Sequence, residues 1–214
     1  VEGQDSIAMQ EAFTRAAGIL LAHAESGLLD VAVFGPAFVL LDEVVPEGLL
    51  ARTRFSAWVR AEAIFSRRLS SDDEQTLDAR AQIAYWRGEA GAPSAALSLC
   101  EALLPELERV FGLEHPRTLI TRNHIAAWTG RSGDAGAALM LFDALLPDLQ
   151  CVLGPDQPDT LRTRSSLAGW TGQVGNARGA LSLFKALLPD LQRVLGPDHP
   201  DTLRVRNNIA GWTG

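Results

Sequence analysis

The amino-acid sequence predicts an all-α protein built as an α-solenoid, in which helix-turn-helix repeats stack side by side. Three observations support this fold class. The same residues recur at a fixed spacing of 42, each repeated segment carries two helical patterns, and glycine-containing turns separate the patterns. A period of this length is typical of repeat proteins, because a single helix pair can bury its apolar stripes only against neighbouring pairs.

Four markers establish the repeat. The Thr-Leu pair that begins at Thr76 returns at Thr118, Thr160 and Thr202, each step being 42 residues. Arginine, tryptophan and glycine recur in the same register, at Arg80, Arg122, Arg164 and Arg206, at Trp86, Trp128, Trp170 and Trp212, and at Gly88, Gly130, Gly172 and Gly214. We therefore expect complete repeats at about 73–114, 115–156 and 157–198, and a terminal half-repeat at 199–214.

The third repeat shows both of its helices clearly. A first helix is expected over 158–173, because Pro158 suits the first helical turn and Asp159 complements the helix dipole. Gly175 and Asn176 then break the helix. A second helix is expected over 177–195, with an apolar stripe of Ala180, Leu183, Phe184, Leu187, Leu188, Leu191 and Val194.

Each second helix contains a proline, at Pro105, Pro147 and Pro189. Proline removes one backbone hydrogen bond and crowds the preceding turn, so we expect a kink or a break into two shorter helices. The carbonyl groups that lose their donor belong to polar residues expected to face water, namely Glu101, Asp143 and Lys185.

The N-terminal part carries a weaker form of the pattern. Residues 1–47 are expected to be a helical cap or degenerate repeat, and residues 48–214 the repeat array. Within the N-terminal part and the start of the array, helices are expected over 7–26, 36–45 and 49–69. The apolar run at 31–34 is interpreted as a loop or a helix start, since an isolated strand would have no partner.

Two segments resemble a known family. Residues 195–203 (LGPDHPDTL) and 206–210 (RNNIA) are similar to the long tetratricopeptide repeats of kinesin light chains and of large bacterial signalling proteins with tandem arrays. The resemblance covers about residues 70–214. It implies a right-handed superhelix whose first helices line a concave, peptide-binding face. The chain departs from the family pattern at Arg164, where a large apolar residue is usual, and at Trp170, which sits one place early.

The resemblance also implies candidate binding residues. In this family asparagines on the first helices often hold a bound peptide's backbone, because one amide offers two donors and an acceptor. The matching positions here are Asn123, His124, Ser165, Ser166, Asn207 and Asn208. Tyr85 lies further along the same face, where its equivalents are the small Ala127, Gly169 and Gly211. Arg162 and Arg204 are expected to add positive charge.

The other recurring residues are interpreted as structural. The tryptophans are expected to form a packing ladder rather than an aromatic ligand site. The arginines of the repeat are expected to pair with nearby carboxylates or helix-end carbonyls rather than form an anion-binding row. His115 and His199 precede helix-starting prolines and can cap the first turn; Gln157 replaces them in the third repeat, which argues against a metal or catalytic role.

Composition limits the function classes. The formal net charge is -7 with no basic tract, which argues against nucleic acid or an anionic membrane as the main partner. The two cysteines, Cys100 and Cys151, are expected to be ordinary helix residues in a reducing compartment. No metal-ligand spacing, phosphate-binding loop or nucleophile motif occurs, so no catalytic residue, metal or cofactor is expected. With no signal peptide and no apolar segment approaching a membrane span, a cytoplasmic protein is expected.

The leading functional prediction is a protein- or peptide-binding scaffold that acts through its concave face. The alternatives are a regulatory or sensor segment that controls an attached domain of a larger signalling protein, and a self-assembly module. Ile209 and Trp212 are expected to need a following second helix as cover. Self-association through residues 199–214, forming a homo-oligomer, is therefore also expected.

Overall fold

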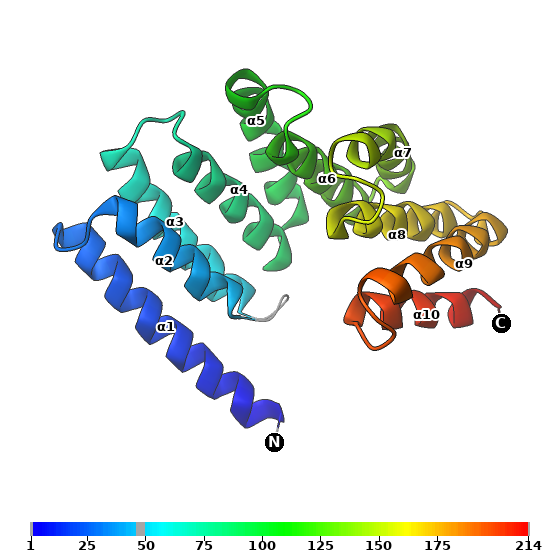
Figure 1. Cartoon of the computed structure of the whole chain (residues 1–214), viewed down its shortest axis with the longest axis horizontal. Coiled ribbons are helices and arrows are strands. Elements are labelled where there is room, and N and C mark those ends of the chain that lie inside the picture. Colours follow the sequence, from blue (N-terminus) through cyan, green and yellow to red (C-terminus); the bar gives the residue numbers. More distant parts are fainter. Residues whose placement is uncertain (1, 46–49, 214) are drawn as a thin grey trace. The chain divides into compact units, whose positions relative to one another are not determined.

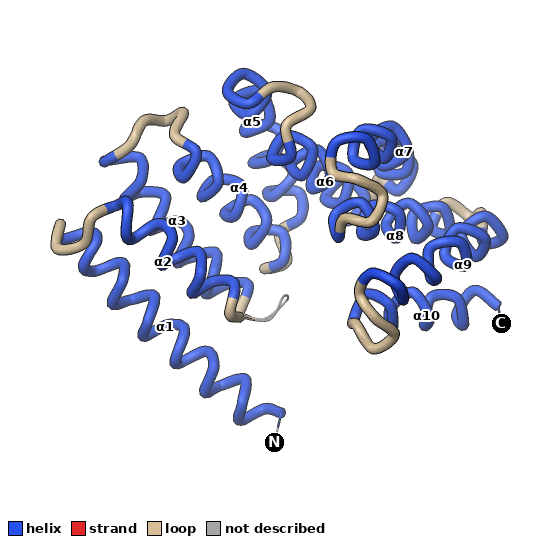
Figure 2. The backbone as a smooth tube through the Cα atoms, in the orientation of Figure 1, coloured by secondary structure: helices blue, strands red, loops and turns tan. Residues whose placement is uncertain are grey.

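The computed structural model describes the backbone of residues 2–45 and 50–213, and the side chains of 7–45 and 50–211. Helices joined by turns and short loops make up these ranges, and no strand occurs in them (Figures 1 and 2). The helices are α1 (Glu2–Ser26), α2 (Val31–Glu43), α3 (Ala51–Arg68), α4 (Glu74–Glu89), α5 (Pro93–Phe111), α6 (Pro116–Arg131), α7 (Ala135–Val152), α8 (Pro158–Gln173), α9 (Ala177–Val194) and α10 (Pro200–Thr213). The predicted all-α fold is confirmed.

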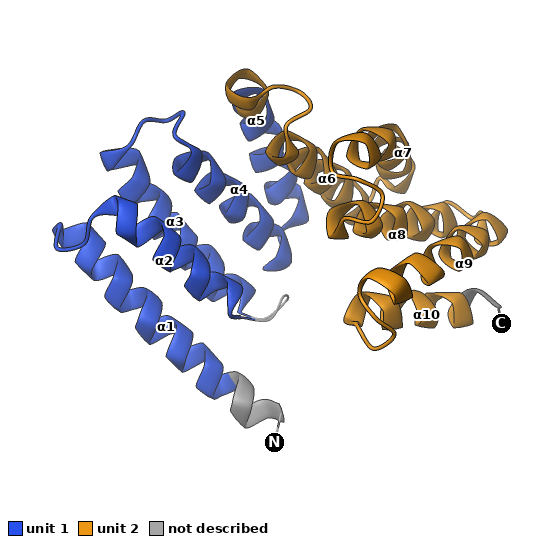
Figure 3. Cartoon of the chain, viewed as in Figure 1, with its two compact units in different colours: residues 1–106 blue, residues 107–214 orange. Residues whose placement is uncertain are grey.

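The chain forms two compact units, residues 1–106 and 107–214 (Figure 3). Unit 1 holds α1 to α4 and most of α5; unit 2 holds the end of α5 and α6 to α10. The boundary between the units falls inside α5, whereas the predicted division into a cap and an array was placed at residue 47. That division stays a prediction.

In unit 1 the core lies between α1, α2, α3 and α4. α1 packs on α2 and α3, and α3 packs on α4. Aromatic rings fill the centre: Phe38 meets Trp58 edge-on at 4.9 Å between centroids, and Phe34 lies 5.4 Å from Phe65. Aromatic pairs at these separations add favourable energy to the burial of their area.

The start of α2 differs from the sequence prediction. The helix begins at Val31, five residues before the predicted start at Pro36, so the run at 31–34 is a helix start. Asp30 explains the difference: its carboxylate accepts a hydrogen bond from the Ala32 N–H at 2.8 Å and caps the first turn. Pro36 lies inside the helix, and α2 continues through it.

In unit 2 consecutive helices pack on one another, α6 on α7, α7 on α8, α8 on α9 and α9 on α10. One core cluster joins Leu119 of α6 to Leu145 and Leu149 of α7. The corresponding cluster in the next repeat joins Leu161 of α8 to Leu187 and Leu191 of α9. The predicted stacking of helix pairs is thus confirmed within this unit.

The prolines of the second helices do not divide them. α5, α7 and α9 each run unbroken through Pro105, Pro147 or Pro189, so the expected division into shorter helices is wrong, and the alternative of a kink at each proline stays a prediction. The residues whose carbonyls lose a donor, Glu101, Asp143 and Lys185, are exposed as expected. Water can satisfy those carbonyls, and the continuous apolar stripe holds the helix together on its buried side.

The expectation about membrane spans also needs correction. By length and composition alone, α7 is long and apolar enough to cross a membrane. Its buried stripe of Ala138, Phe142, Leu145 and Leu149 packs within the repeat stack, and Asp143 and Asp148 lie on the same helix. These features match those of α5 and α9, so α7 is explained as a core helix of the repeat.

The recurring tryptophans, arginines and histidines have the predicted structural roles in the described residues. Trp86 and Trp128 are buried, and Trp170 is half-buried over Gly130, where a Cβ atom would overlap its indole ring. The tryptophan equivalent at 212 lies outside the described side chains.

Carboxylates pair with the arginines of three repeats: Arg80 with Glu62 and Glu106, Arg122 with Glu108, and Arg164 with Asp190.

The two histidines cap their helices as expected. The Nδ1 atom of His115 accepts a hydrogen bond from the Arg117 N–H at 3.3 Å, and that of His199 accepts one from the Asp201 N–H at 3.2 Å. Gln157, their equivalent in the third repeat, makes no side-chain cap.

Candidate functional site

Each first helix of unit 2 presents three faces, which α8 illustrates. One face carries Leu161 and Ala168, which pack against α9. A second face points to the preceding repeat, where Leu167 packs with Ala126 of α6 and Phe142 of α7. An α-helix has 3.6 residues per turn, so the residues between these two contact faces form a third face. It carries Arg162, Ser166 and Gly169.

We call this third face, taken over α6, α8 and α10, the floor face. The 42-residue period places three equivalent residues on each helix: Ile120, His124 and Ala127 on α6; Arg162, Ser166 and Gly169 on α8; and Arg204, Asn208 and Gly211 on α10. Each of these nine residues is half-buried or exposed, so the face is accessible in all three helices.

Two glycines leave the floor face open. A Cβ atom built on Gly169 or Gly211 would meet nothing within 4 Å, whereas one on Gly130 would overlap a neighbouring ring. Neither glycine is therefore required by packing in the described structure. Glycine in a helix interior is unfavourable relative to alanine by about 0.5–1 kcal/mol. Their effect is to leave the helix backbone within reach of a ligand.

Carboxylates accompany the arginines of the floor face. Asp201 accepts a hydrogen bond from Arg204 at 2.7 Å and lies 3.6 Å from Arg162 of the preceding first helix. Arg162 also lies 3.8 Å from Asp159. The result is a row of alternating charges, Asp159, Arg162, Asp201 and Arg204, across α8 and α10. The expected excess of positive charge is therefore absent here, since both arginines are paired.

Asp201 stays ionised at this position. Its burial opposes ionisation, but the hydrogen bond from Arg204 and the charges of Arg204 and Arg162 outweigh burial and lower the pKa of Asp201. Sequence reasoning missed Asp159 and Asp201 as members of the site. The signal was present, because Asp and Arg recur three residues apart at the start of both helices, a spacing that brings the side chains together.

His124 is the titratable side chain of this face on α6. Burial of the imidazole lowers its pKa from 6.5 to about 4, and the positive charge of Arg162 adds to the effect. His124 is therefore neutral at pH 7, with one nitrogen able to donate and the other to accept a hydrogen bond. It is a polar group and carries no charge there.

The second row of predicted residues, Asn123, Ser165 and Asn207, lies on a different side of the helices. The Oδ1 atom of Asn123 accepts a hydrogen bond from the Thr163 hydroxyl at 2.8 Å, which links α6 to α8. Ser165 is buried, and its hydroxyl has no hydrogen-bond partner among the described residues. Asn207 is exposed on α10. Asn123 thus contributes to the packing of α6 on α8.

One substitution between repeats accounts for the difference between Asn123 and Ser165. Thr163, which donates to Asn123, is replaced one period later by Val205, which has no hydroxyl and is fully buried. The equivalent of the Asn123–Thr163 hydrogen bond therefore cannot form between Ser165 and Val205. Asn123 and Ser165 offer little to a ligand, which leaves His124, Ser166 and Asn208 as the accessible polar row.

Tyr85 belongs to unit 1 and is therefore described apart from the floor face. Its ring meets that of Trp86 edge-on at 4.8 Å between centroids and is half-buried. No group of three or more His, Cys, Asp or Glu side chains in the described residues could hold a metal ion. Cys100 is buried, which raises the pKa of its thiol to about 12, and Cys151 is exposed on α7.

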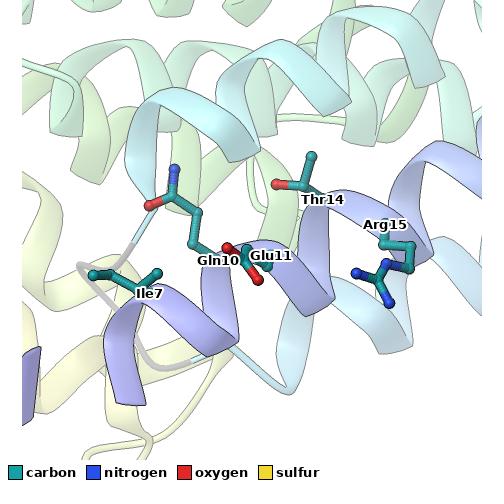
Figure 4. Close-up of a pocket in the computed structure, with 5 residues that line it drawn as sticks. All are labelled: Ile7, Gln10, Glu11, Thr14 and Arg15. Atoms are coloured by element: carbon teal, nitrogen blue, oxygen red, sulfur yellow. The ribbon is translucent and has the colours of Figure 1, made fainter. Parts of the chain in front are cut away.

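A shallow pocket lies elsewhere, on α1 of unit 1 (Figure 4). Its lining residues, Ile7, Gln10, Glu11, Thr14 and Arg15, all come from this one helix. Because Ile7 is 60% exposed, the pocket is open to solvent and does not enclose a small molecule. None of the residues predicted for binding lies there.

Comparisons with known proteins agree with this geometry. Residues 160–201 match the model of a tetratricopeptide repeat family. BtubC (BKLC) from P. vanneervenii has a similar structure, with a TM-score of 0.72, 15% identity, and coverage of 94% of this chain and 82% of that one. A structure from Podosopora anserina, described as a kinesin light chain with nearly identical TPR-like repeats, matches with a TM-score of 0.60.

A point variant of the Podosopora anserina protein matches with a TM-score of 0.61. The protein and its variant are each 16% identical to this chain, and each match covers 94% of this chain and 84% of the other. No curated protein matches the sequence. Similarity at this identity establishes the fold. Together with the 42-residue period and the family match in the third repeat, it shows that the chain folds as a solenoid of tetratricopeptide-type helix pairs.

Proposed function

We propose that this protein is a non-enzymatic scaffold that binds an extended peptide segment of another protein on the floor face of α6, α8 and α10. Tetratricopeptide repeats generally mediate contacts between proteins, and the fold of this chain supports such a role. The location on the floor face is supported by Gly169 and Gly211, where open space adjoins the helix backbone.

The side chains around these glycines suit an extended backbone. Ser166 and Asn208 lie one helical turn from Gly169 and Gly211, and neutral His124 occupies the equivalent place on α6. Hydroxyl, amide and neutral imidazole groups each can donate and accept hydrogen bonds, as do peptide N–H and C=O groups. Arg162 and Arg204 are held in place by Asp201, which reduces the entropy that they would lose on binding.

A selection experiment tests the proposal. A library of random peptides is selected against the chain 1–214, and the affinity of a recovered peptide is measured for variants. Asn208→Ala should weaken binding by about 1–3 kcal/mol if the amide holds an otherwise buried peptide group. Gly169→Phe should abolish binding, because the ring would occupy the open floor.

The matched control is Lys185→Ala on the exposed side of α9, which should leave the affinity unchanged. If Lys185→Ala abolishes binding while Gly169→Phe and Asn208→Ala leave it intact, the ligand sits on the second helices and the proposal is wrong. Circular dichroism of every variant separates lost binding from lost structure.

A further inference from the structure

The outer side of α7 carries an exposed apolar surface. Met140 is 68% exposed, and three further apolar residues follow it at helical spacing, so they form a stripe about 17 Å long on one side of the helix. Leu141 and Val152 widen the stripe on one flank. We call this surface the α7 patch: Met140, Leu141, Ala144, Pro147, Cys151 and Val152. The second helices α5 and α9 precede and follow α7 in the chain, so the patch belongs to an interior repeat.

The other second helices show that the fold does not require this patch. α9 packs on α8 as α7 packs on α6, yet it is polar at two of the equivalent positions. One period away on either side, serine stands in place of Met140 and arginine in place of Cys151: Ser98 and Arg109 in α5, and Ser182 and Arg193 in α9. An exposed apolar surface that stacking does not need is typical of an interaction site.

The charges beside the patch differ between repeats as well. In α9 the Asp190 carboxylate accepts a hydrogen bond from Arg164 of α8 at 2.8 Å, and it lies 3.4 Å from Arg193 one turn along its own helix. Asp190 is thus paired with two guanidinium groups. Its counterpart in α7 is Asp148.

Asp148 lacks both of these partners. Arg122 of α6, the counterpart of Arg164, donates instead to Glu108 of α5 at 2.9 Å. Cys151 stands where α9 has Arg193 and carries no positive charge. Asp148 is exposed, and no ion pair joins it to another residue in the part of the chain that the structure describes. The repeat therefore shows which group is missing beside Asp148, namely a guanidinium at the position of residue 151.

We propose that the α7 patch binds an amphipathic helix of a partner protein whose apolar face is edged by arginine. The apolar face covers Met140 and Ala144, since a methionine side chain adapts readily to the shape of a partner. A partner arginine lies over Cys151 and pairs with Asp148, as Arg193 pairs with Asp190 in α9. Asp143, which is exposed on the other flank of the stripe, favours a second basic residue there.

Charge complementarity favours this occupant over two others. α7 contains no basic residue, so two copies joined through their patches would bring carboxylates together. An anionic membrane surface would meet the same carboxylates and be repelled by them. The patch lies on a second helix, so this inference does not rest on the floor face of the first helices.

The test uses a fluorescent synthetic peptide with leucine at i, i+4, i+7 and i+11 and an arginine on each side of this stripe. A second peptide carries glutamate in place of each arginine. Titration with the chain 1–214, followed by anisotropy, should give saturable binding for the arginine peptide alone. Bound peptide should also slow the alkylation of Cys151 by iodoacetamide, whereas Cys100 is buried and serves as the internal reference.

Variants of α7 identify the site. Met140→Ser combined with Cys151→Arg gives α7 the residues of α9, so it should fold, and it should weaken binding at least about tenfold. Asp148→Asn should weaken binding about two- to fivefold, because an ion pair at the surface stays partly solvated. Asp198→Asn is the matched control: it removes an exposed carboxylate from the turn before α10 and should leave the affinity unchanged. Asn208→Ala on the floor face should have no effect either. Circular dichroism establishes that each variant is folded.

Four results would overturn the proposal. The first is the absence of saturable binding by the arginine peptide. The second is binding that the double variant leaves intact or that does not protect Cys151, which would place the peptide elsewhere on this acidic chain. The third is a dimer in sedimentation that the double variant converts to a monomer while the peptide fails to bind, which would assign the patch to a second copy. The fourth is binding to phosphatidylglycerol vesicles that the double variant loses while the peptide fails to bind, which would assign the patch to a membrane.

Discussion

The guanidinium group of Arg54 lies in the core of unit 1 and is fully engaged there. It donates to both carboxylate oxygens of Asp42 at 2.7 and 2.8 Å and to the Asp42 carbonyl at 2.9 Å. It also lies 3.6 Å above the centroid of the Trp86 ring. These contacts join α2, α3 and α4, and they show that a planar, bidentate cation suits this position.

Arg54→Ala should therefore destabilise the protein strongly. The side chains of Arg54 and Asp42 are only 5% and 7% exposed, so the variant leaves a buried carboxylate without its cation. Removing one partner of such a pair costs about 3–5 kcal/mol in the free energy of unfolding. Urea denaturation measures the change.

Two further variants make the interpretation specific. Arg60→Ala removes an arginine that pairs with Glu25 on the surface, and we expect it to cost no more than about 1 kcal/mol. Replacing both buried partners, with Arg54→Met and Asp42→Leu, should recover much of the lost stability. Equal losses in Arg54→Ala and Arg60→Ala would contradict a buried pair.

His124 links stability to pH. Its pKa is lowered to about 4 in the folded chain against 6.5 without the fold, so the unfolded chain binds more protons between these values. Stability contributed by the neutral imidazole is thus fully present above about pH 6.5 and is lost as the pH falls toward 4. Asp201 does not titrate in this window, because its pKa is lowered from 3.8.

His124→Gln should flatten this dependence. We expect the thermal midpoint of the unaltered chain to fall between pH 6.5 and 4 by more than that of the variant. An NMR titration of the imidazole gives the pKa directly. A midpoint near 6.5 would show that the side chain is solvated as in an unfolded peptide.

At the scale of the helices, one glycine makes room for a close contact between α6 and α8. Trp170 of α8 packs over Gly130 of α6, where a Cβ atom would overlap the indole. In this pair of helices, the missing side chain of the glycine leaves the space that the tryptophan ring of the next repeat occupies.

Two glycine substitutions distinguish packing from access. Gly130→Ala should destabilise the chain by about 1–3 kcal/mol, because the added methyl group forces Trp170 to move. Gly169→Ala should be neutral or stabilising by up to about 1 kcal/mol, because open space surrounds it and alanine favours the helix. Chemical denaturation measures the free energy of unfolding of both variants. If Gly169→Ala were the less stable of the two, there would be room for a side chain at Gly130.

Helix bounds could be predicted from the sequence where short-range signals set them. Pro158 at a first turn and Asn176 at a cap fixed the ends of α8 and α9 to within one residue. The behaviour of Pro147 could not be predicted, because continuity of α7 depends on packing along its whole buried stripe. The repeat period predicts which positions are equivalent, but it does not predict the direction in which each side chain points.

The direction of the side chains was the main limit at the site. Ile209 was expected to face a following second helix, but it packs against the cluster of Leu161 and Phe184 in the preceding repeat. The exposed apolar residues of α10 are Leu203 and Ala210 instead. Likewise, Asn123 and His124 are adjacent in sequence, yet one binds the next helix and the other faces the floor. Assigning these faces required the neighbouring helices.

At the scale of the whole molecule, the repeat makes the chain modular within unit 2. Equivalent positions of α8 and α10 have similar packing roles: Leu167 corresponds to Ile209, and Thr163 to Val205. α10 could therefore take the place of α8 beside α7. In a stack of this kind, stability is approximately a sum of terms for each repeat and each interface between neighbours.

Deletion of residues 157–198, one full period, should consequently leave a folded protein. Asp156 is then followed by His199, which starts α10 with the same imidazole cap as His115 gives α6. In the deletion variant, Val205 takes the place of Thr163, so Asn123 loses the hydroxyl that donates a hydrogen bond to it. We therefore expect a lower free energy of unfolding and an unchanged helical circular dichroism signal per residue. Circular dichroism and urea denaturation measure the two quantities.

Deletion of residues 157–176 alone is the control, since it removes α8 and its turn but keeps α9. α9 would then follow α7 directly, and Phe184, Leu187 and Leu191 would lose the residues of α8 that cover them in the core cluster. Burying each such side chain contributes about 1.5–3 kcal/mol, which exceeds what an isolated helix can offset. We expect this shorter deletion to lose more helix than the longer one. A shorter deletion that stays as helical as the full-period deletion would mean that α9 does not need its first helix, and that stacking by whole repeats does not govern this fold.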